Sequence, residues 1–197
     1  FAAISYLRRH PKLKNSKIVT FGSSWGGGIQ MYMLSDWYSQ IIGGGQTVDG
    51  HIAITPYCYL TVDKPTVSSE ATRSLVIYGE KDIWTKPKPC QDYVAKLKTS
   101  GGLINEHIVK GGNHGLARVQ KEKKYKVTTW NCQVTFEPST MKAFHRRENK
   151  TADFNKGWGN VWDDCVGENM VVTGGTKAQR KEVESVIQRH LDLVFGG

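Results

Sequence analysis

Short apolar runs alternate with helical segments along the first half of this chain. Strand-like runs occupy 17–21, 52–55, 75–78 and 104–109, and a glycine or proline follows each within two residues. Apolar residues at helical spacing precede the first run, follow it, and precede the fourth run. This alternation is typical of crossover units, which build a parallel sheet with helices on its faces. The sequence therefore predicts an α/β fold with a mainly parallel sheet.

The second half of the chain departs from this alternation. Residues 177–195 carry apolar side chains at helical spacing, which predicts an amphipathic helix. The stretch 117–175 is longer than a simple crossover and includes a strand-like run at 127–130. We therefore expect a single domain over 1–197, with 117–175 as an insertion within it before the last helix.

The chain is basic, with 27 Lys and Arg against 18 Asp and Glu and a net charge of +9. Much of the excess lies in 117–150. Charge runs are usually solvated, and no recognition motif accompanies this one, so we expect no nucleic-acid partner. No apolar run reaches the roughly 18 residues that a membrane-spanning helix requires. No basic and apolar leader follows Phe1.

The four cysteines are Cys58, Cys90, Cys132 and Cys165, and none forms a C-x-x-C pair or has histidine at zinc-ligand spacing. We expect no metal and no cofactor. Cys58 and Cys90 both lie beyond carboxyl ends of strands and form one candidate disulfide. Cys132 and Cys165, in the insertion, form a second, with two buried free thiols as the alternative. With the glycosylation sequence at Asn149, the cysteines favour a secreted or lumenal glycoprotein.

The first strand-like run ends in the sequence Gly22-Ser23-Ser24-Trp25-Gly26, which has the pattern G-x-S-x-G between a strand and a helix. A nucleophilic serine in such a turn needs a strained backbone so that its hydroxyl stands clear of the sheet, and the flanking glycines leave the necessary room. The N-terminus of the following helix favours a developing negative charge. Ser24 is therefore the candidate nucleophile, and the alternative is a turn without chemistry.

Two further candidates follow later strands. Asp82 follows the third run in Gly79-Glu80-Lys81-Asp82, where a carboxylate can orient an imidazole, and Glu80 is the fallback. His114 follows the fourth run, in a glycine-rich loop that lets it reach a serine. The chain order Ser, Asp, His is the order of α/β-hydrolases. We expect Ser24, Asp82 and His114 to meet at the carboxyl edge of the sheet.

These segments resemble the α/β-hydrolase superfamily and, within it, the dienelactone hydrolase-like branch. The resemblance rests on Ile18 to Gly27, Leu75 to Asp82 and Gly111 to Gly115, and covers the chain to about Leu116 and the last helix. It implies an α/β-hydrolase fold and a serine esterase without cofactor. Dienelactone hydrolases proper have a cysteine nucleophile, and Ser24 departs from it. The resemblance therefore implies ester hydrolysis in general and not specifically their lactone substrate. Prolyl-oligopeptidase-type peptidases share much the same motifs.

The family has strands and helices before the nucleophile, and one of their loops donates the second oxyanion-hole N–H. The resemblance therefore implies that this chain is N-terminally incomplete. Its partner would be an N-terminal segment of the same protein, which is either a separate chain that stays bound or a part of the same chain that precedes these residues. The backbone N–H of Trp25 is the candidate first oxyanion donor. A sheet truncated in this way exposes a long apolar edge.

Aromatic residues follow the second and third strand-like runs, and we expect Tyr57, Tyr59 and Trp84 to form the substrate-binding wall. Core packing is the alternative for each. Aromatic walls suit an apolar or aromatic ester as the small-molecule substrate. The sequence predicts hydrolysis of a carboxylic ester or lactone through an acyl-enzyme. The alternatives are a non-catalytic hydrolase-like binding or structural subunit, and a prolyl-oligopeptidase-type serine peptidase.

Overall fold

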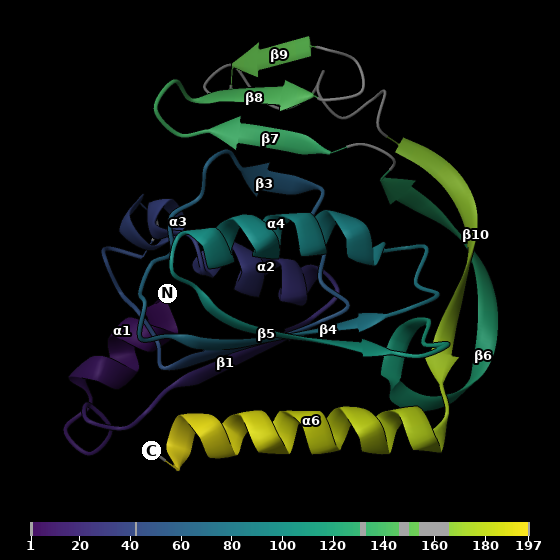
Figure 1. The fold of residues 1–197 in the computed structure, drawn as a ribbon, viewed down its shortest axis with the longest axis horizontal. Coiled ribbons are helices and arrows are strands. Elements are labelled where there is room, and N and C mark those ends of the chain that lie inside the picture. Colours follow the sequence, from purple (N-terminus) through teal and green to yellow (C-terminus); the bar gives the residue numbers. More distant parts are fainter. Residues whose placement is uncertain (1, 42, 131–132, 146–149, 154–165, 197) are drawn as a thin grey trace.

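The computed structural model describes residues 2–41, 43–130, 133–145, 150–153 and 166–196. At its centre lies a parallel sheet with the strand order β1-β2-β4-β5 (Figure 1). Because all strands point the same way, their carboxyl ends share one edge. The strands are β1 (Val19–Ser23), β2 (Gly50–Ile54), β4 (Arg73–Gly79) and β5 (Leu103–Val109).

Helices cover both faces of this sheet, as Figure 1 shows. Along β2 and β4 alternate side chains pack in opposite directions: Ala53 and Val76 join the cluster under α2 and α4, whereas Ile52 and Leu75 join the cluster under α6. This two-residue period confirms the predicted α/β architecture, with a mainly parallel sheet flanked by helices. The helices are α1 (Ala2–Arg9), α2 (Trp25–Met33), α3 (Asp36–Ile41), α4 (Pro87–Thr99) and α6 (Lys177–Phe195).

The C-terminal helix α6 has the bounds that the sequence predicts. It begins with a capping box, in which the Thr176 hydroxyl accepts from the Gln179 N–H and the Gln179 side chain accepts from the Thr176 N–H. These bonds satisfy two backbone donors at the helix N-terminus. The apolar stripe of α6 buries Val183 and Val186 against the sheet.

The segment between the sheet and α6 forms two β structures. A long antiparallel ribbon pairs β6 (His114–Trp130) with β10 (Val166–Gly175), and Figure 1 shows it curving along one side of the molecule. The second is a small sheet of order β3-β7-β8-β9 beyond α4. Its strand β3 comes from the first half of the chain, so the insertion is tied to the α/β core. These strands are β3 (Leu60–Val62), β7 (Val134–Glu137), β8 (Lys142–His145) and β9 (Lys150–Asp153).

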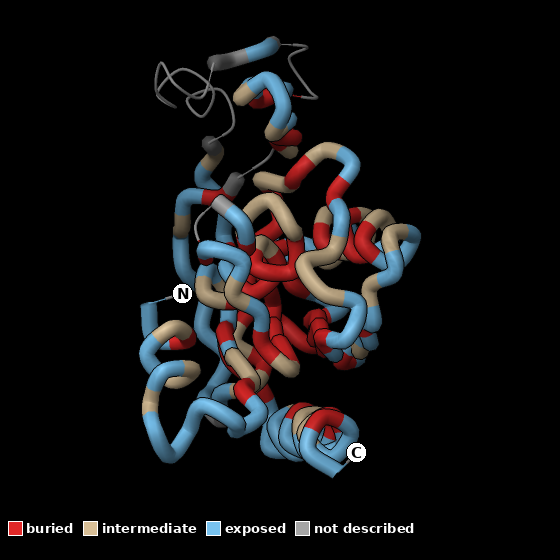
Figure 2. The backbone as a smooth tube through the Cα atoms, turned by 90° about the vertical axis from the view of Figure 1, so that its left-hand side faces the viewer, coloured by how far each residue is buried: buried red, intermediate tan, exposed pale blue. Residues whose placement is uncertain are grey.

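The buried residues gather around the central sheet, and Figure 2 shows exposed backbone on the outward side of α6. Strand β1 is an edge of the central sheet. Beside it lies an apolar groove of about 520 Å³, between α1, β1 and α6. Phe21 on β1 is 59% exposed. The groove is lined by Leu7, Leu13, Ser16, Lys17, Ile18, Val19, Phe21, Ile52, Ile187, Leu191 and Phe195.

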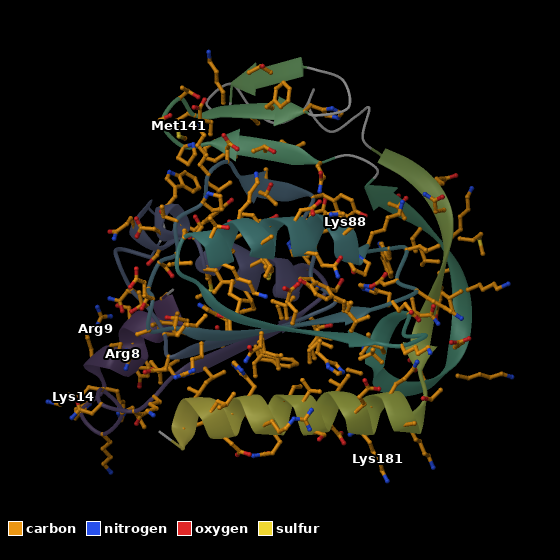
Figure 3. All side chains as sticks on the ribbon, viewed as in Figure 1. Arg8, Arg9, Lys14, Lys88, Met141 and Lys181 are labelled. Carbon is orange, nitrogen blue, oxygen red and sulfur yellow. A yellow bond between two sulfur atoms is a disulfide. The ribbon has the colours of Figure 1, made fainter. Side chains whose placement is uncertain are left out.

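The basic side chains are distributed over several elements. Lys121, Lys123 and Lys124 of β6 are exposed, as the sequence predicts for a charge run. Figure 3 shows further basic side chains on other elements, including Arg8 and Arg9 on α1 and others on the loop after it and on α4 and α6. Within the described ranges, no helix has the length and apolar character that a membrane span requires.

A disulfide joins Cys58 and Cys90, one of the two pairs that the sequence offers. It connects the loop after β2 to the first turns of α4, across a separation of 32 residues. In the chain-entropy description, a closed loop of this size stabilises a fold by about 3–4 kcal/mol because it restricts the unfolded chain.

We expect the double variant Cys58→Ser with Cys90→Ser to lower the free energy of unfolding by about 2–4 kcal/mol, because the unfolded chain regains its loop entropy. Urea denaturation followed by tryptophan fluorescence measures this change. The parent protein treated with reductant is the comparison and should show at least the same loss, because reductant opens the Cys58–Cys90 bond and any bond between Cys132 and Cys165. An unchanged unfolding midpoint in both samples would mean that the crosslink does not hold the fold.

Candidate active site

Ser24 lies on the tight turn between β1 and α2. Its backbone has φ +57°, in the left-handed region that non-glycine residues rarely adopt. Two hydrogen bonds fix the turn: the Ser24 N–H donates to the Ile54 carbonyl at 2.9 Å, and the Ser24 carbonyl accepts from the Gly28 N–H at 3.0 Å. The strain is thus held by the neighbouring strand and by the first turn of the helix.

Two glycines allow this turn to pack closely. A Cβ added at Gly22 would lie 2.2 Å from the Gly26 carbonyl oxygen, and one added at Gly28 would lie 2.6 Å from the Tyr57 carbonyl oxygen. Both contacts are with backbone, which cannot rotate away. Close approach between backbone segments therefore accounts for Gly22 and Gly28. The expectation that both glycines flanking Ser24 leave necessary room is wrong for Gly26, where an added Cβ would meet no atom within 4 Å.

The structure brings Ser24, His114 and Asp82 into one line of hydrogen bonds. His114 Nε2 lies 2.9 Å from Ser24 Oγ, and His114 Nδ1 lies 2.9 Å from Asp82 Oδ2. Asp82 and His114 are both buried. With the proton on Nδ1 facing the carboxylate, Nε2 is free to accept the proton of the serine hydroxyl. The three residues follow the carboxyl ends of three different strands, β1, β4 and β5.

His114 differs in one respect from the expectation that it lies in a loop. It is the first residue of β6 and pairs with Thr173 of β10. The histidine is therefore held by a strand, and the loop before it is short. Gly115 directly after it has φ +77°, a conformation that glycine adopts without strain.

Asp82 is oriented by the residues that follow it. Its Oδ1 accepts hydrogen bonds from the backbone N–H groups of Trp84 at 2.9 Å and Thr85 at 3.0 Å. Its Oδ2 lies 2.8 Å from the Thr85 hydroxyl. The loop after β4 thus forms a cradle that holds the carboxylate toward His114.

Glu80, the fallback for the acid, has a different place. Its Oε2 accepts from the Gly111 N–H at 2.8 Å, so it binds the loop that precedes the histidine. The same two loops are also joined by backbone bonds from Glu80 to Val109 and from Lys81 to Gly112. Glu80 therefore fixes the position of the histidine loop and does not contact the imidazole.

Two residues of this neighbourhood are not found by the sequence analysis. The Asn113 side-chain amide donates to Glu122 Oε1 at 2.7 Å and connects the histidine loop to the ribbon. Thr85 contacts both Asp82 and His114. The position of Thr85, three residues after Asp82, resembles an ordinary turn threonine, and only the fold reveals its contacts.

Aromatic rings lie beside the serine and the histidine. The rings of Trp25 and Tyr57 are 4.7 Å apart, those of Tyr57 and Tyr59 are 5.0 Å apart, and Trp84 lies 4.7 Å from the imidazole of His114. Burial raises the pKa of Tyr57 and of Tyr59 above the ordinary value. Both phenols are therefore neutral at physiological pH, and both side chains are buried.

Trp25 is the first residue of α2, so the helix itself does not use its backbone N–H. This group is the oxyanion donor that the sequence predicts. In the part of the chain that the structure describes, no group of three His, Cys, Asp or Glu side chains could hold a metal ion. Cys132, Cys165 and Asn149 lie outside the described residues, as do the disulfide and glycosylation predictions made for them.

Two solved structures illustrate what this chain is similar to. MGS-M1, an α/β-hydrolase enzyme from a Medee basin deep-sea metagenome library, is 20% identical over 57% of this chain and 47% of its own, with a TM-score of 0.45. An arylesterase is 17% identical over 57% of this chain and 50% of its own, with a TM-score of 0.43. The chain thus spans about half the length of these structures. No family model matches the sequence, and no curated protein matches it.

The two acidic residues of the loop after β4 can be told apart by matched variants. We expect Asp82→Asn to lower kcat by about 10⁴-fold, because an amide favours the wrong imidazole tautomer. Glu80→Gln keeps a side-chain oxygen that can accept from Gly111, so we expect it to retain activity within about 10-fold. Steady-state kinetics on an aryl ester measures both. A larger loss in Glu80→Gln than in Asp82→Asn would reverse the assignment.

Proposed function

We propose that this chain carries the catalytic residues of a serine hydrolase that cleaves a carboxylic ester or lactone. One observation carries the proposal: the continuous hydrogen-bond line from Ser24 Oγ through the imidazole of His114 to Asp82, with both distances at 2.9 Å. A surface serine in a turn has no need of such an arrangement. The strained backbone at Ser24 also supports it, since strain of this kind persists where the surrounding structure enforces it.

The reaction would proceed in two halves. His114 takes the proton from the Ser24 hydroxyl as its oxygen attacks the substrate carbonyl, and then gives this proton to the leaving alcohol as the acyl-enzyme forms. Water, activated by the same imidazole, releases the acid and restores Ser24. Asp82 stabilises the imidazolium in both halves. The backbone N–H of Trp25 stabilises the negative charge on the carbonyl oxygen.

The aromatic wall supports an apolar or aromatic acyl or alcohol group in the substrate. Trp25, next to Ser24, is 61% exposed and packs on the buried ring of Tyr57, which packs on that of Tyr59, while Trp84 packs against the imidazole of His114. The two tyrosines remain uncharged. Rings of this kind contribute both apolar area and geometric preference to binding.

We further propose that the edge of β1 is completed by a strand from an N-terminal segment of the same protein, which also supplies the second oxyanion donor. Strand β1 is an edge strand, and an exposed strand edge is a template for further pairing. The neighbouring groove has room and apolar lining for side chains of the added strand. The exposed ring of Phe21 would be covered by the same segment.

A photoreactive benzoyl-phenylalanine in place of Phe21, in the protein as expressed from its full gene, tests this partner. We expect crosslinks to a peptide outside residues 1–197 after irradiation, identified by mass spectrometry. The same probe at Ile108, an exposed position on the opposite edge strand β5, is the control. Crosslinks from Phe21 to a second copy of this chain, or none at all, would contradict the proposal.

The ester class is tested by comparing a p-nitrophenyl ester with a dipeptide-derived amide of the same nitroaryl type. We expect kcat/KM to be larger for the ester, and the amide to be turned over little. Efficient amide cleavage would favour a serine peptidase. Folded protein without turnover of either compound would favour a non-catalytic binding or structural subunit.

A further inference from the structure

The hydroxyl of Thr85 lies at the junction of three groups of the site. It is 2.8 Å from Asp82 Oδ2, 3.1 Å from His114 Nδ1 and 3.0 Å from the Thr55 carbonyl oxygen. Thr85 is 5% exposed, so water does not supply these bonds in its place. A threonine there contacts both members of the pair that the proposed function uses as acid and base.

The hydroxyl carries one proton, which restricts the bonds it can make. It can donate to Asp82 Oδ2, to the Thr55 carbonyl or, in the other imidazole tautomer, to His114 Nδ1. Nδ1 also lies 2.9 Å from Asp82 Oδ2, and a carboxylate accepts hydrogen bonds, so the Nδ1–H tautomer makes this contact favourable and leaves the hydroxyl the first two arrangements. In the first arrangement it shares with His114 the task of holding Oδ2. In the second it accepts from Nδ1–H beside the carboxylate. Both arrangements are compatible with the imidazole proton on Nδ1, which the Asp82 carboxylate favours.

Thr55 gives this junction a fixed anchor. It lies at the end of β2, its N–H donates to the Ile77 carbonyl of β4 at 2.7 Å, and its φ is +42°. Since Ser24 N–H is bound to Ile54, the same strand end holds the serine turn on one side and the Thr85 hydroxyl on the other. The serine turn and the loop that includes Thr85 are thus both hydrogen-bonded to the end of β2.

We propose that Thr85 is a positioning residue for the acid and base of this site. It holds the Asp82 carboxylate in the plane of the imidazole and fixes the Nδ1–H tautomer of His114, so that Nε2 faces Ser24. The inference rests on the proposed serine hydrolase function, because a tautomer matters only if Nε2 accepts the serine proton.

The test compares Thr85→Val, which keeps the shape and removes the hydroxyl, with Thr85→Ser, which keeps the hydroxyl. We expect Thr85→Val to lower kcat about 10-fold to 100-fold with KM within about two-fold, since one hydrogen bond to a buried charged group is lost. Thr85→Ser should stay within about three-fold of the parent protein. Thr128→Val, at an exposed position of β6 in the ribbon, is the control for the substitution itself.

A second readout does not depend on turnover. The proton between His114 Nδ1 and Asp82 gives a far-downfield proton NMR signal in such pairs. We expect this signal in the parent protein and in Thr85→Ser, and we expect it to shift or broaden in Thr85→Val. Urea denaturation of the same samples reports whether the variants are folded.

The possible outcomes distinguish a failure of the Thr85 positioning role from a failure of the proposed serine hydrolase function. Turnover and a downfield signal in the parent protein, both unchanged in Thr85→Val, would overturn the role of Thr85 and leave the hydrolase proposal intact. A loss in Thr85→Val that Thr85→Ser does not restore would make the role one of packing, and would also overturn the inference. A folded parent protein with the downfield signal but without turnover would count against the hydrolase function, while the signal in Thr85→Val would still test Thr85.

Discussion

Ser24→Ala should abolish ester hydrolysis while leaving the fold in place. We expect kcat to fall by about 10⁴-fold or more, because the attacking oxygen is removed and only binding and oxyanion stabilisation remain. Alanine removes the hydroxyl that contacts His114 and keeps the Cβ, so the backbone strain at φ +57° is the same in both proteins. The free energy of unfolding should change by less than about 1 kcal/mol.

Ser23→Ala is the matched control for this variant, since Ser23 is the adjacent serine at the end of β1 and its side chain is exposed. It should keep most of the activity. Initial rates at saturating aryl ester, with urea denaturation of each protein, give the comparison. Equal activity in Ser24→Ala and the parent protein would remove Ser24 from the mechanism.

Gly22→Ala should damage both stability and activity. The added Cβ would lie 2.2 Å from the Gly26 carbonyl oxygen and 2.9 Å from the Gly27 nitrogen, so the helix start must move away from β1. We expect the free energy of unfolding to fall by about 2–4 kcal/mol, as for other overpacked sites. We also expect kcat to fall at least about 100-fold, because Ser24 moves with the helix start and the near-attack geometry is lost.

Gly26→Ala is the control for this prediction. An added Cβ at Gly26 would meet no atom within 4 Å, and the residue lies in the first turn of α2. Alanine at a helical position with free space favours the helix by up to about 1 kcal/mol. The unfolding temperature and the kcat for an ester are measured for both variants, and we expect both to be lower in Gly22→Ala than in Gly26→Ala. If Gly26→Ala were the more harmful of the two, the close packing described for this turn would be wrong.

Local periodicity was sufficient to predict the central sheet and α6. The runs that became β1, β2, β4 and β5 are short, apolar and bounded by glycine or proline, and their ends shift by only one or two residues. The insertion could not be predicted in the same way. Strand β7 pairs with β3, which is distant in the sequence, and β8 and β9 extend this sheet in turn. The ribbon strand β6 includes a long run of exposed polar residues without strict alternation.

Some residues of the candidate site could be identified from the sequence and others could not. Ser24, Asp82 and His114 could be singled out because each follows a strand and their chain order fits one known arrangement, and the structure places them within hydrogen-bond distance. The roles of Glu80 and Thr85 could not be predicted from the sequence, because they depend on which loops lie side by side in the fold. A sequence contains the residue types of such contacts but not the distances between them.

The most direct test of a serine nucleophile at Ser24 is labelling of the native protein with a fluorophosphonate probe, followed by peptide mapping and intact mass analysis. We predict one label per chain, on the peptide that contains Ser24, and none after heat denaturation. The intact mass also shows whether a further segment copurifies. Folded, full-length protein that takes no label, or takes it on a different serine, would contradict the account.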